Sequence, residues 1–309
     1  MSNSMARSTT TARIQGVIAA AISPMHEDGS LDKALFERHV RYLVEAGVHG
    51  LFIGGTAGEG PYLSSEERIE LFRLARGIVG ASLPLYLAFL RPDTRTVIRE
   101  MAQAARSLGD SGPDYVSAVA PLYYPVGQEA LRRHFSMIAD AAPVPLILYN
   151  IPGNTHNALD LQTIQELAQH ERIAGIKESS GDFALFSQGL LEADADSFSW
   201  IQGKDHHDGP ALMLGAPALI TGLGNVWIEP YVALYRAICE RNWQRVNDAQ
   251  LSINRLSRAV RSGGGGPLPS IKAAAMARWK ARAFTRLPSM ELPADVAAQT
   301  QRLVQQEID

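Results

Sequence analysis

Short apolar runs alternate with longer amphipathic segments from residue 14 to about residue 240, and this alternation constrains the fold more than any other feature. The runs lack the polar alternation of a half-exposed strand, so we expect strands that are covered on both faces. Eight such runs occur: GVIAAAIS from Gly16, GLFIGG from Gly50, PLYLAFL from Pro84, DYVSAVA from Asp114, PLILYN from Pro145, RIAGIK from Arg172, SFSWIQG from Ser197 and APALITG from Ala216. Eight strand–helix units predict an α/β protein with a (β/α)₈ TIM barrel, and an open doubly wound sheet is the alternative.

The segments between these runs carry the residues that are typical of helix ends. In the first segment Asp32 falls in the first turn and Gly47 ends the helix. In the second, Ser64 or Ser65 is expected as the N-cap, with glutamates following it. The segments therefore predict helices between the strands, as a barrel of this type requires.

Beyond residue 240 the strand pattern stops, and three helices are expected over residues 243–260, 268–283 and 293–306. A glycine-rich loop over residues 262–269 separates the first two. The polar residues 1–13 lack the apolar stretch of a secretion signal, and we expect them to be disordered. The predicted organisation is a disordered leader over 1–13, a catalytic barrel over 14–240 and a three-helix C-terminal extension over 241–309.

Charge and cysteine content exclude several classes of function. The 29 basic and 32 acidic residues give a net charge of −3, which argues against binding to nucleic acid. No apolar run approaches the ~18 residues of a membrane span. The single cysteine, Cys239, rules out an intrachain disulfide and a cysteine metal cluster, and its apolar helix suggests a small core residue. A reducing, cytoplasmic setting fits this content.

Reactive residues of such barrels stand at the C-terminal ends of the strands. The ends of the predicted strands carry Thr56 in GGTAGEG, Tyr123 and Tyr124 in APLYYP, Tyr149 in LYNIP and Lys177 in GIKES. One lysine, one threonine and three tyrosines are therefore expected to converge on one rim.

Lys177 is the most informative of these residues. Only five of the 29 basic residues are lysines, yet a lysine closes an apolar strand. Lysine loses its proton readily on burial and arginine does not, so this position suits attack on a ketone. A structural lysine paired with Glu178 is the alternative. The hydroxyl of Tyr149 is suited to proton transfer, although a core tyrosine with a satisfied hydroxyl is the common alternative.

The glycine-rich stretch GGTAGEG at residues 54–60 lacks the lysine of a nucleotide-binding loop. Its backbone N–H groups are suited to a small carboxylate, and we expect Glu59 to brace the loop by hydrogen bonds. His206 and His207 are adjacent, and adjacent helical positions point about 100° apart, so they seldom chelate together. The sequence therefore predicts no metal site.

The order GGTxGE, PxYY, LYNIP and GIKES resembles the dihydrodipicolinate synthase / N-acetylneuraminate lyase family. The resemblance covers about residues 14–285 and includes GPLPSIKAA, which is similar to the family's motif before its penultimate helices. The step of 28 residues from Tyr149 to Lys177 is its most specific part. A single glycine motif would not identify the family.

The resemblance implies a homotetramer of barrels and a class I aldolase mechanism without cofactor or metal. In the family, the lysine matching Lys177 forms an imine with the keto group of pyruvate or another 2-keto acid, and the tyrosine matching Tyr149 transfers protons. The threonine matching Thr56 connects this tyrosine to the one matching Tyr123, which reaches in from a neighbouring subunit. The further positions that the resemblance implies, in the carboxylate loop and near the imine, are Gly55, Ala57, Gly203 and Ile220.

The chain departs from the family at two positions. A second hydroxyl residue is common where this chain has Ala57, so one side-chain contact to the carboxylate is missing. The synthases carry an arginine for their second substrate, aspartate semialdehyde, where this chain has Asn154, and asparagine cannot replace a bidentate guanidinium. Arg91 and Lys204 follow strands at the expected mouth, and we hypothesise that one of them binds the distal end of the substrate; exposed rim cations are the alternative.

These departures order the candidate functions. The first is an aldolase that reversibly cleaves a 2-keto-3-deoxy sugar acid or a 4-hydroxy-2-keto acid into pyruvate and an aldehyde. The second is a dehydratase that uses the same imine, and the third is dihydrodipicolinate synthase, which Asn154 disfavours. A non-catalytic homologue that binds keto acids would be expected to lack the lysine or the tyrosine, and both are present.

Overall fold

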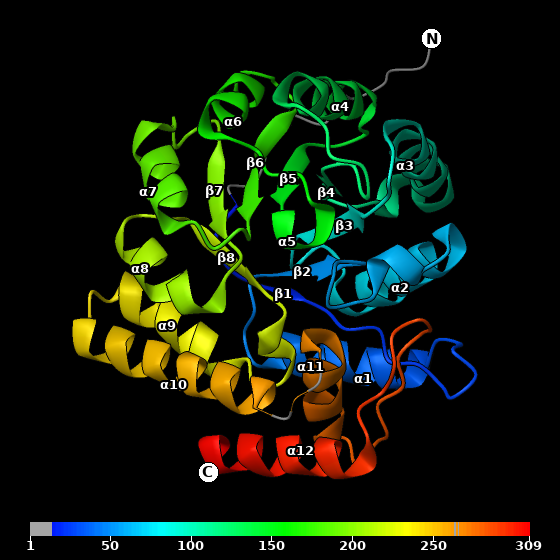
Figure 1. Cartoon of the computed structure of the whole chain (residues 1–309), viewed down its shortest axis with the longest axis vertical. Helices are drawn as coiled ribbons and strands as arrows, with labels where there is room; N and C mark the ends of the chain where they lie inside the picture. The colour runs from blue at the N-terminus through cyan, green and yellow to red at the C-terminus, as the bar shows by residue number, and fades with distance from the viewer. Residues whose placement is uncertain (1–13, 263, 265) are drawn as a thin grey trace.

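The computed structural model describes residues 14–309 except residues 263 and 265 (Figure 1). Its eight strands form one closed barrel in chain order, and each strand is parallel to its neighbours. The barrel closes where Gly16 pairs with Ala218 and Ile18 with Ile220. The strands are β1 Gly16–Ala20, β2 Gly50–Ile53, β3 Leu85–Phe89, β4 Tyr115–Val119, β5 Leu146–Asn150, β6 Ile173–Glu178, β7 Ser199–Gln202 and β8 Ala218–Thr221. The barrel prediction is confirmed, and the doubly wound alternative is wrong.

Helices follow the strands and cover the outside of the barrel (Figure 1). The sequence signals at their ends are largely confirmed: Ser64 caps α2, with Glu67 completing a capping box. Asp32 is the N-cap of α1 and not a first-turn residue, because its side chain accepts the N–H of Leu35. The helices of this layer are α1 Lys33–Glu45, α2 Ser65–Val79, α3 Thr94–Leu108, α4 Gln128–Ala141, α5 Pro152–Thr155, α6 Leu161–Ala168, α7 Phe183–Glu192, α8 Asp208–Met213 and α9 Glu229–Cys239. Short 3-10 turns lie at η1 Gly60–Tyr62, η2 Gly109–Ser111, η3 Asp205–His207 and η4 Leu223–Asn225.

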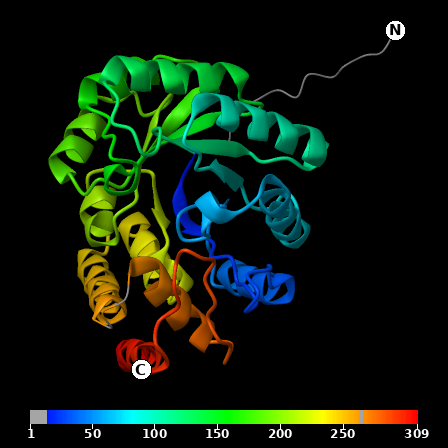
Figure 2. The same cartoon turned by 45° about the vertical axis from the view of Figure 1, so that its right-hand side comes forward.

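Three further helices, α10 Trp243–Arg261, α11 Pro267–Ala277 and α12 Ala294–Ile308, lie together on one side of the barrel (Figure 2). All three predicted helices are present. The second was predicted too long, since the chain turns at Lys280, whose φ of 51° is left-handed. The predicted leader over 1–13 lies outside the described residues, as do two residues of the predicted glycine-rich loop.

The apolar core has two parts, one between the sheet and the helices and one inside the barrel. The interior part is filled by large side chains, and the rings of Tyr86 and Tyr115 stack there with centroids 4.9 Å apart. Phe52 meets the Tyr149 ring edge-on above them. This packing closes the barrel beneath its carboxyl-end rim, so chemistry is possible at the rim and not through the barrel.

Cys239 is exposed, and its prediction as a core residue was wrong. The buried positions of α9 include Tyr231, Leu234 and Ala237, and a cysteine two residues after the last of these falls off that stripe.

No helix in the described part of the chain has both the length and the apolarity required to cross a bilayer.

Candidate active site

Lys177, Tyr149 and Thr56 lie together at the carboxyl ends of the strands. Lys177 on β6 pairs directly with Tyr149 on β5 in the parallel register. The Lys177 side chain is 4% exposed, and its Nζ lies 4.1 Å from the centroid of the Tyr149 ring and 4.9 Å from that of Phe52. The Tyr149 hydroxyl is 3.3 Å from Oγ1 of Thr56. An amine, a phenol and an alcohol therefore form one continuous group.

Glu178 does not pair with Lys177. Consecutive strand residues point to opposite faces, and the Glu178 carboxylate accepts the side-chain amide of Asn150 at 2.6 Å and the N–H of Ser180. Burial raises the pKa of Glu178, although these two donors oppose the shift. Among the described residues no carboxylate forms an ion pair with Lys177. The structural alternative for this lysine therefore finds no support in the geometry.

The charge of Lys177 acts on Tyr149. Burial alone would raise the pKa of the Tyr149 phenol, but the nearby ammonium and hydrogen bonds with Thr56, Lys177 and Ser179 lower it below its ordinary value. A phenol with a lowered pKa gives up and recovers a proton more readily at neutral pH. The site is therefore arranged for proton transfer beside an amine.

The loop at residues 54–60 turns its carbonyls inward. The N–H groups of Gly58 and Gly60 donate to the Gly55 carbonyl, and the N–H of Glu59 donates to the Thr56 carbonyl. In the described part of the chain the N–H groups of Thr56 and Ala57 have no acceptor. Two neighbouring donors are thus available at the rim for a small anion.

Glu59 braces this loop from beneath, as the sequence predicted. Its buried carboxylate pairs with Lys272 and also accepts the backbone N–H of Arg286 at 2.8 Å. The partners come from the C-terminal part of the chain. No sequence signal paired Glu59 with Lys272, because 213 residues separate them.

Gly203 and Ile220 complete the surroundings of Lys177. A Cβ on Gly203 would lie 2.1 Å from the Ser179 hydroxyl and 3.3 Å from Cε of Lys177, so only glycine leaves the lysine this room. The Gly203 N–H donates to the Glu178 carbonyl at 2.9 Å. Ile220 is buried on β8 inside the barrel. Gly222 follows β8, and a Cβ added to it would lie 3.1 Å from the Cβ of Ala57.

Tyr123 and Tyr124 follow β4 at the same end of the barrel, but neither forms a hydrogen bond or ring contact with Lys177, Tyr149 or Thr56 within one chain. They are 78% and 71% exposed, and their rings meet edge-on. Tyr123 has a φ of 81°, a left-handed backbone conformation that is uncommon for a residue other than glycine.

Asn157, which sequence reasoning missed, fixes the loop that carries these tyrosines. Its side-chain N–H groups donate to the carbonyls of Pro121 and Tyr124, and its Oδ1 accepts the N–H of Val126. This buried clamp holds Tyr123 in its exposed position. An asparagine seven residues after a strand gives no recognisable signal in a single sequence.

Arg91 and Lys204 differ in what they contact. All three side-chain nitrogens of Arg91 donate within the chain, to Glu100 and to the carbonyls of Pro61 and Leu63. This arrangement weighs against the hypothesis that Arg91 binds substrate, because the guanidinium is already engaged as a brace of η1. Lys204 forms no ion pair with any described residue, so its ammonium remains available.

Asn154 and the histidines lie around the mouth. Asn154 is exposed in α5, where its amide can face a ligand from outside. The His206 ring contacts Asn254 at 3.1 Å and the hydroxyl of Ser257 at 3.3 Å on α10. Burial lowers the pKa of His207, and the charges of His206 and Lys204 add to the shift.

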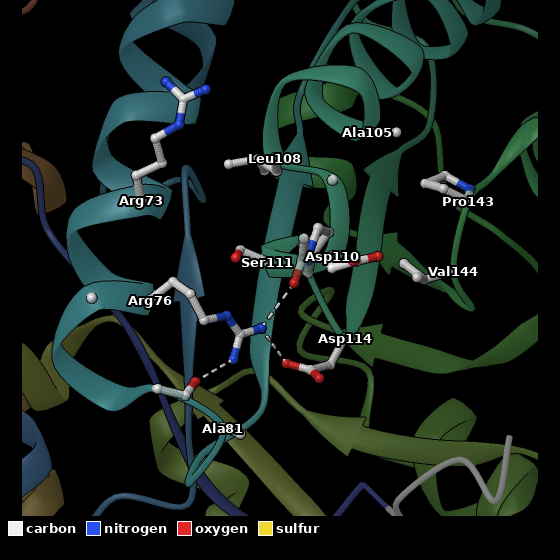
Figure 3. A pocket seen from close by; sticks show the side chains of 15 residues that line it. Arg73, Arg76, Ala81, Ala105, Leu108, Asp110, Ser111, Asp114, Pro143 and Val144 are labelled. Carbon is white, nitrogen blue, oxygen red and sulfur yellow. Dashed lines mark hydrogen bonds and ion pairs between the residues drawn. The ribbon is translucent and has the colours of Figure 1, made fainter. Parts of the chain in front are cut away.

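A cavity of about 870 Å³ lies far from this group, at the amino ends of β3, β4 and β5 (Figure 3). Arg76 points into it, but its guanidinium is fixed by the carbonyls of Gly80 and Gly112 and by Asp114 at 2.7 Å. The cavity therefore offers space without the amine and phenol that chemistry at the rim uses.

The chain is similar in sequence to several known proteins. The model of the dihydrodipicolinate synthetase family matches residues 13–307. A 4-hydroxy-tetrahydrodipicolinate synthase of Methanosphaerula palustris is 33% identical over 92% of this chain and 96% of its own length. An uncharacterised DapA-like lyase of Thermococcus onnurineus is 35% identical over 79% of this chain and 82% of its own.

Solved structures show the same relationship. Dihydrodipicolinate synthase from Acinetobacter baumannii, complexed with pyruvate, superposes with a TM-score of 0.88 at 26% identity, over 95% of this chain and 99% of that one. The YagE protein of Escherichia coli K12, also in complex with pyruvate, gives 0.86 at 25% identity, over 96% and 99% of the two chains.

Proposed function

The chain belongs to the dihydrodipicolinate synthetase family and is a Schiff-base lyase of the class I aldolase type, and we propose that Lys177 is its nucleophile. One observation carries this proposal: the Lys177 amine is buried against the ring of its register partner Tyr149, and the Tyr149 hydroxyl contacts Thr56. Among the described lysines, Lys177 has this environment at the carboxyl ends of the strands, where barrel enzymes react.

The proposed reaction begins with attack of the Lys177 amine on the keto carbon of a 2-keto acid. Tyr149 gives its proton to the leaving hydroxyl of the carbinolamine, which departs as water and leaves a protonated imine and a tyrosine phenolate. The imine withdraws electrons from the neighbouring carbon. Tyr149 then takes the proton of the C4 hydroxyl as the C3–C4 bond breaks, which releases an aldehyde and leaves an enamine. Protonation of the enamine at C3 and hydrolysis return pyruvate and the free lysine.

We propose that the substrate carboxylate rests on the loop of Gly55, Thr56 and Ala57. The free N–H groups of Thr56 and Ala57 support this position, since backbone donors can bind the carboxylate where Ala57 has no hydroxyl. Gly203 and Ile220 would contact the substrate near the imine. The closeness of Gly203 to Cε of Lys177 and the burial of Ile220 inside the barrel support these positions.

A second subunit completes the proposed site. We propose that the chain forms a homotetramer in which Tyr123 reaches into a neighbouring barrel and contacts Thr56 there. Its 78% exposure, its left-handed backbone and the Asn157 clamp support this role, because a large aromatic side chain is held outward in a fixed position. Thr56 would then connect Tyr123 of the partner to Tyr149 in a proton relay.

For the substrate, we propose pyruvate on one side of the reversible reaction and a 2-keto-3-deoxy sugar acid or 4-hydroxy-2-keto acid on the other. Lys204 supports an acidic or hydroxyl-rich distal end, and Asn154 can hydrogen-bond a hydroxyl but cannot form a bidentate pair with a carboxylate. Arg91 is left out of the substrate contacts, since its guanidinium is engaged within the chain.

Synthesis of 4-hydroxy-tetrahydrodipicolinate is the alternative that the comparisons favour, through the name of the Methanosphaerula palustris relative, which matches over 92% of this chain. The two candidates are separated by the partner of pyruvate: aspartate semialdehyde for the synthase and a sugar-derived aldehyde for the aldolase. Asn154 weighs against the synthase, because the carboxylate of aspartate semialdehyde would meet no guanidinium at that position.

The test is product analysis on a panel of 2-keto-3-deoxy sugar acids, with the Lys177→Arg variant as a matched control. We expect release of pyruvate and an aldehyde by the wild type and neither by the variant. Loss of water without pyruvate would identify a dehydratase instead. Condensation of pyruvate with aspartate semialdehyde, and no cleavage of any sugar acid, would overturn the aldolase assignment.

A further inference from the structure

We propose that Lys272, in the penultimate helix α11, is a positioning residue for the carboxylate-binding loop, which it orients through Glu59. The inference rests on the proposed function of that loop and goes beyond it, because it makes the C-terminal segment part of the substrate-binding machinery. Lys272 itself acts through Glu59 and does not touch the substrate.

The contact between loop and helix is fully buried. The side chains of Glu59 and Lys272 are both 0% exposed, and the ammonium bonds to Oε1 of the carboxylate. The other oxygen, Oε2, accepts the backbone N–H of Arg286 at 2.8 Å. Glu59 has a φ of 55°, a left-handed backbone that an L-residue holds only when its surroundings determine it. The C-terminal segment supplies those surroundings.

Two planar peptide groups pass this restraint to the rim. The Thr56 carbonyl and the Ala57 N–H belong to one planar peptide unit, so fixing the carbonyl fixes the direction of the N–H. The N–H of Glu59 holds that carbonyl at 3.1 Å. The preceding unit joins the Gly55 carbonyl, which accepts from Gly58 and Gly60, to the N–H of Thr56. The residue held by Lys272 therefore sets the direction of the donors offered to the substrate.

The following part of the loop is held from the opposite side. Arg68 donates to the Gly60 carbonyl at 2.9 Å and pairs with Glu100, which also binds Arg91. Arg91 in turn holds the carbonyls of Pro61 and Leu63. This second network fixes η1. If the bond between Glu59 and Lys272 is lost, we therefore expect the backbone to shift at residues 55–59 and not in the chain beyond them.

The test compares imine formation with pyruvate and with its methyl ester, both trapped by borohydride. A defect in carboxylate binding lowers the rate at which pyruvate is trapped and leaves the rate for the uncharged ester unchanged. A general loss of structure lowers both rates. For Lys272→Met we expect the preference for pyruvate over the ester to fall by about tenfold, the loss typical of one charge-assisted hydrogen bond. Met276→Ala, which opens a cavity in the same helix, is the matched control and should keep the wild-type preference.

The double variant Glu59→Gln/Lys272→Met keeps the test decisive if Lys272→Met does not fold, because it leaves no unpaired buried charge. It still lacks the bond between loop and helix, so the preference should fall here too. A folded variant of either kind with the wild-type preference would overturn the proposal. If the wild type traps neither compound, the proposed function itself fails, and trapping by the wild type distinguishes the two failures.

Discussion

Two buried lysines in this molecule show that burial does not by itself identify a reactive amine. Lys177 is 4% exposed at the rim, and Lys272 is 0% exposed where α11 meets the barrel. Lys272 is bonded to the carboxylate of Glu59, and burial lowers its pKa while Glu59 opposes that shift. Lys177 faces the rings of Phe52 and Tyr149, and the phenol of Tyr149 has a lowered pKa. The partner of each lysine, and not its burial, distinguishes the proposed nucleophile Lys177 from the structural lysine Lys272.

The largest effect that this contrast predicts is on Lys177. Lys177→Arg keeps a cation of similar reach, but arginine cannot be deprotonated in proteins. We expect cleavage activity to fall by about a thousandfold or more, with thermal unfolding close to that of the wild type. Steady-state kinetics and a melting curve check both parts, and retained turnover would remove Lys177 from the mechanism.

Next in size is the removal of the Tyr149 hydroxyl. Tyr149→Phe keeps the ring beside Lys177 and loses the proton carrier, so kcat should fall by about 10²–10⁴-fold. Imine trapping with pyruvate should persist at a reduced rate. Single-turnover kinetics separate these steps. A variant that cleaves at the wild-type rate would show that another group carries the proton.

At the second lysine, the predicted loss is in stability. Lys272→Met leaves Glu59 buried without its cation, which costs about 3–5 kcal/mol in free energy of unfolding. Lys280→Met, at an exposed lysine eight residues further on, is the matched control and should change little. Urea denaturation measures both. Equal stability of the two variants would mean that the Glu59–Lys272 pair does not hold the C-terminal segment.

The contact between His39 on α1 and Trp279, just after α11, should make part of the stability pH-dependent. Burial lowers the pKa of His39 to about 4, so the folded protein keeps this histidine neutral while the unfolded chain protonates it below its ordinary value of 6.5. The ring bonds to Asn225 and accepts the indole N–H of Trp279. The stability it contributes is present above pH 6.5 and is lost as the pH falls towards 4, by about 3 kcal/mol.

The control for this prediction is His39→Gln, which can make similar hydrogen bonds but does not titrate. Between pH 7 and pH 4 the wild type should lose that amount of unfolding free energy relative to the variant. A difference that stays constant over this range would show that His39 does not titrate in the unfolded chain as expected.

The smallest predicted effect concerns Lys204. Lys204→Ala should raise KM about tenfold or less for a substrate with a distal anion, the effect of losing one charged contact at a half-buried side chain. Imine trapping with pyruvate should be unchanged, because pyruvate does not reach the mouth. Equal KM values for all substrates in wild type and variant would leave Lys204 as a rim cation without a role.

The sequence predicted the barrel because strands buried on both faces are uninterrupted apolar runs, and it located Lys177 and Tyr149 because strand ends can be read from such runs. It could not reveal the pairing of Glu59 with Lys272, since contacts between distant segments depend on how the helices pack. Tyr123 follows its strand at the rim as expected, but its left-handed backbone and its exposure could not be predicted, since loop conformation of this kind is not visible in residue types. Arg91 was read as a free cation because its partner Glu100 lies on the next helix.

The central claim is that Lys177, and not Lys272, forms the imine. Incubation of the wild-type protein with pyruvate and borohydride, followed by peptide mass mapping, tests it directly. The account predicts a reduced pyruvate adduct on the peptide that contains Lys177 and none on the peptide that contains Lys272. An adduct on Lys272, or no adduct on Lys177 with any 2-keto acid, would contradict it.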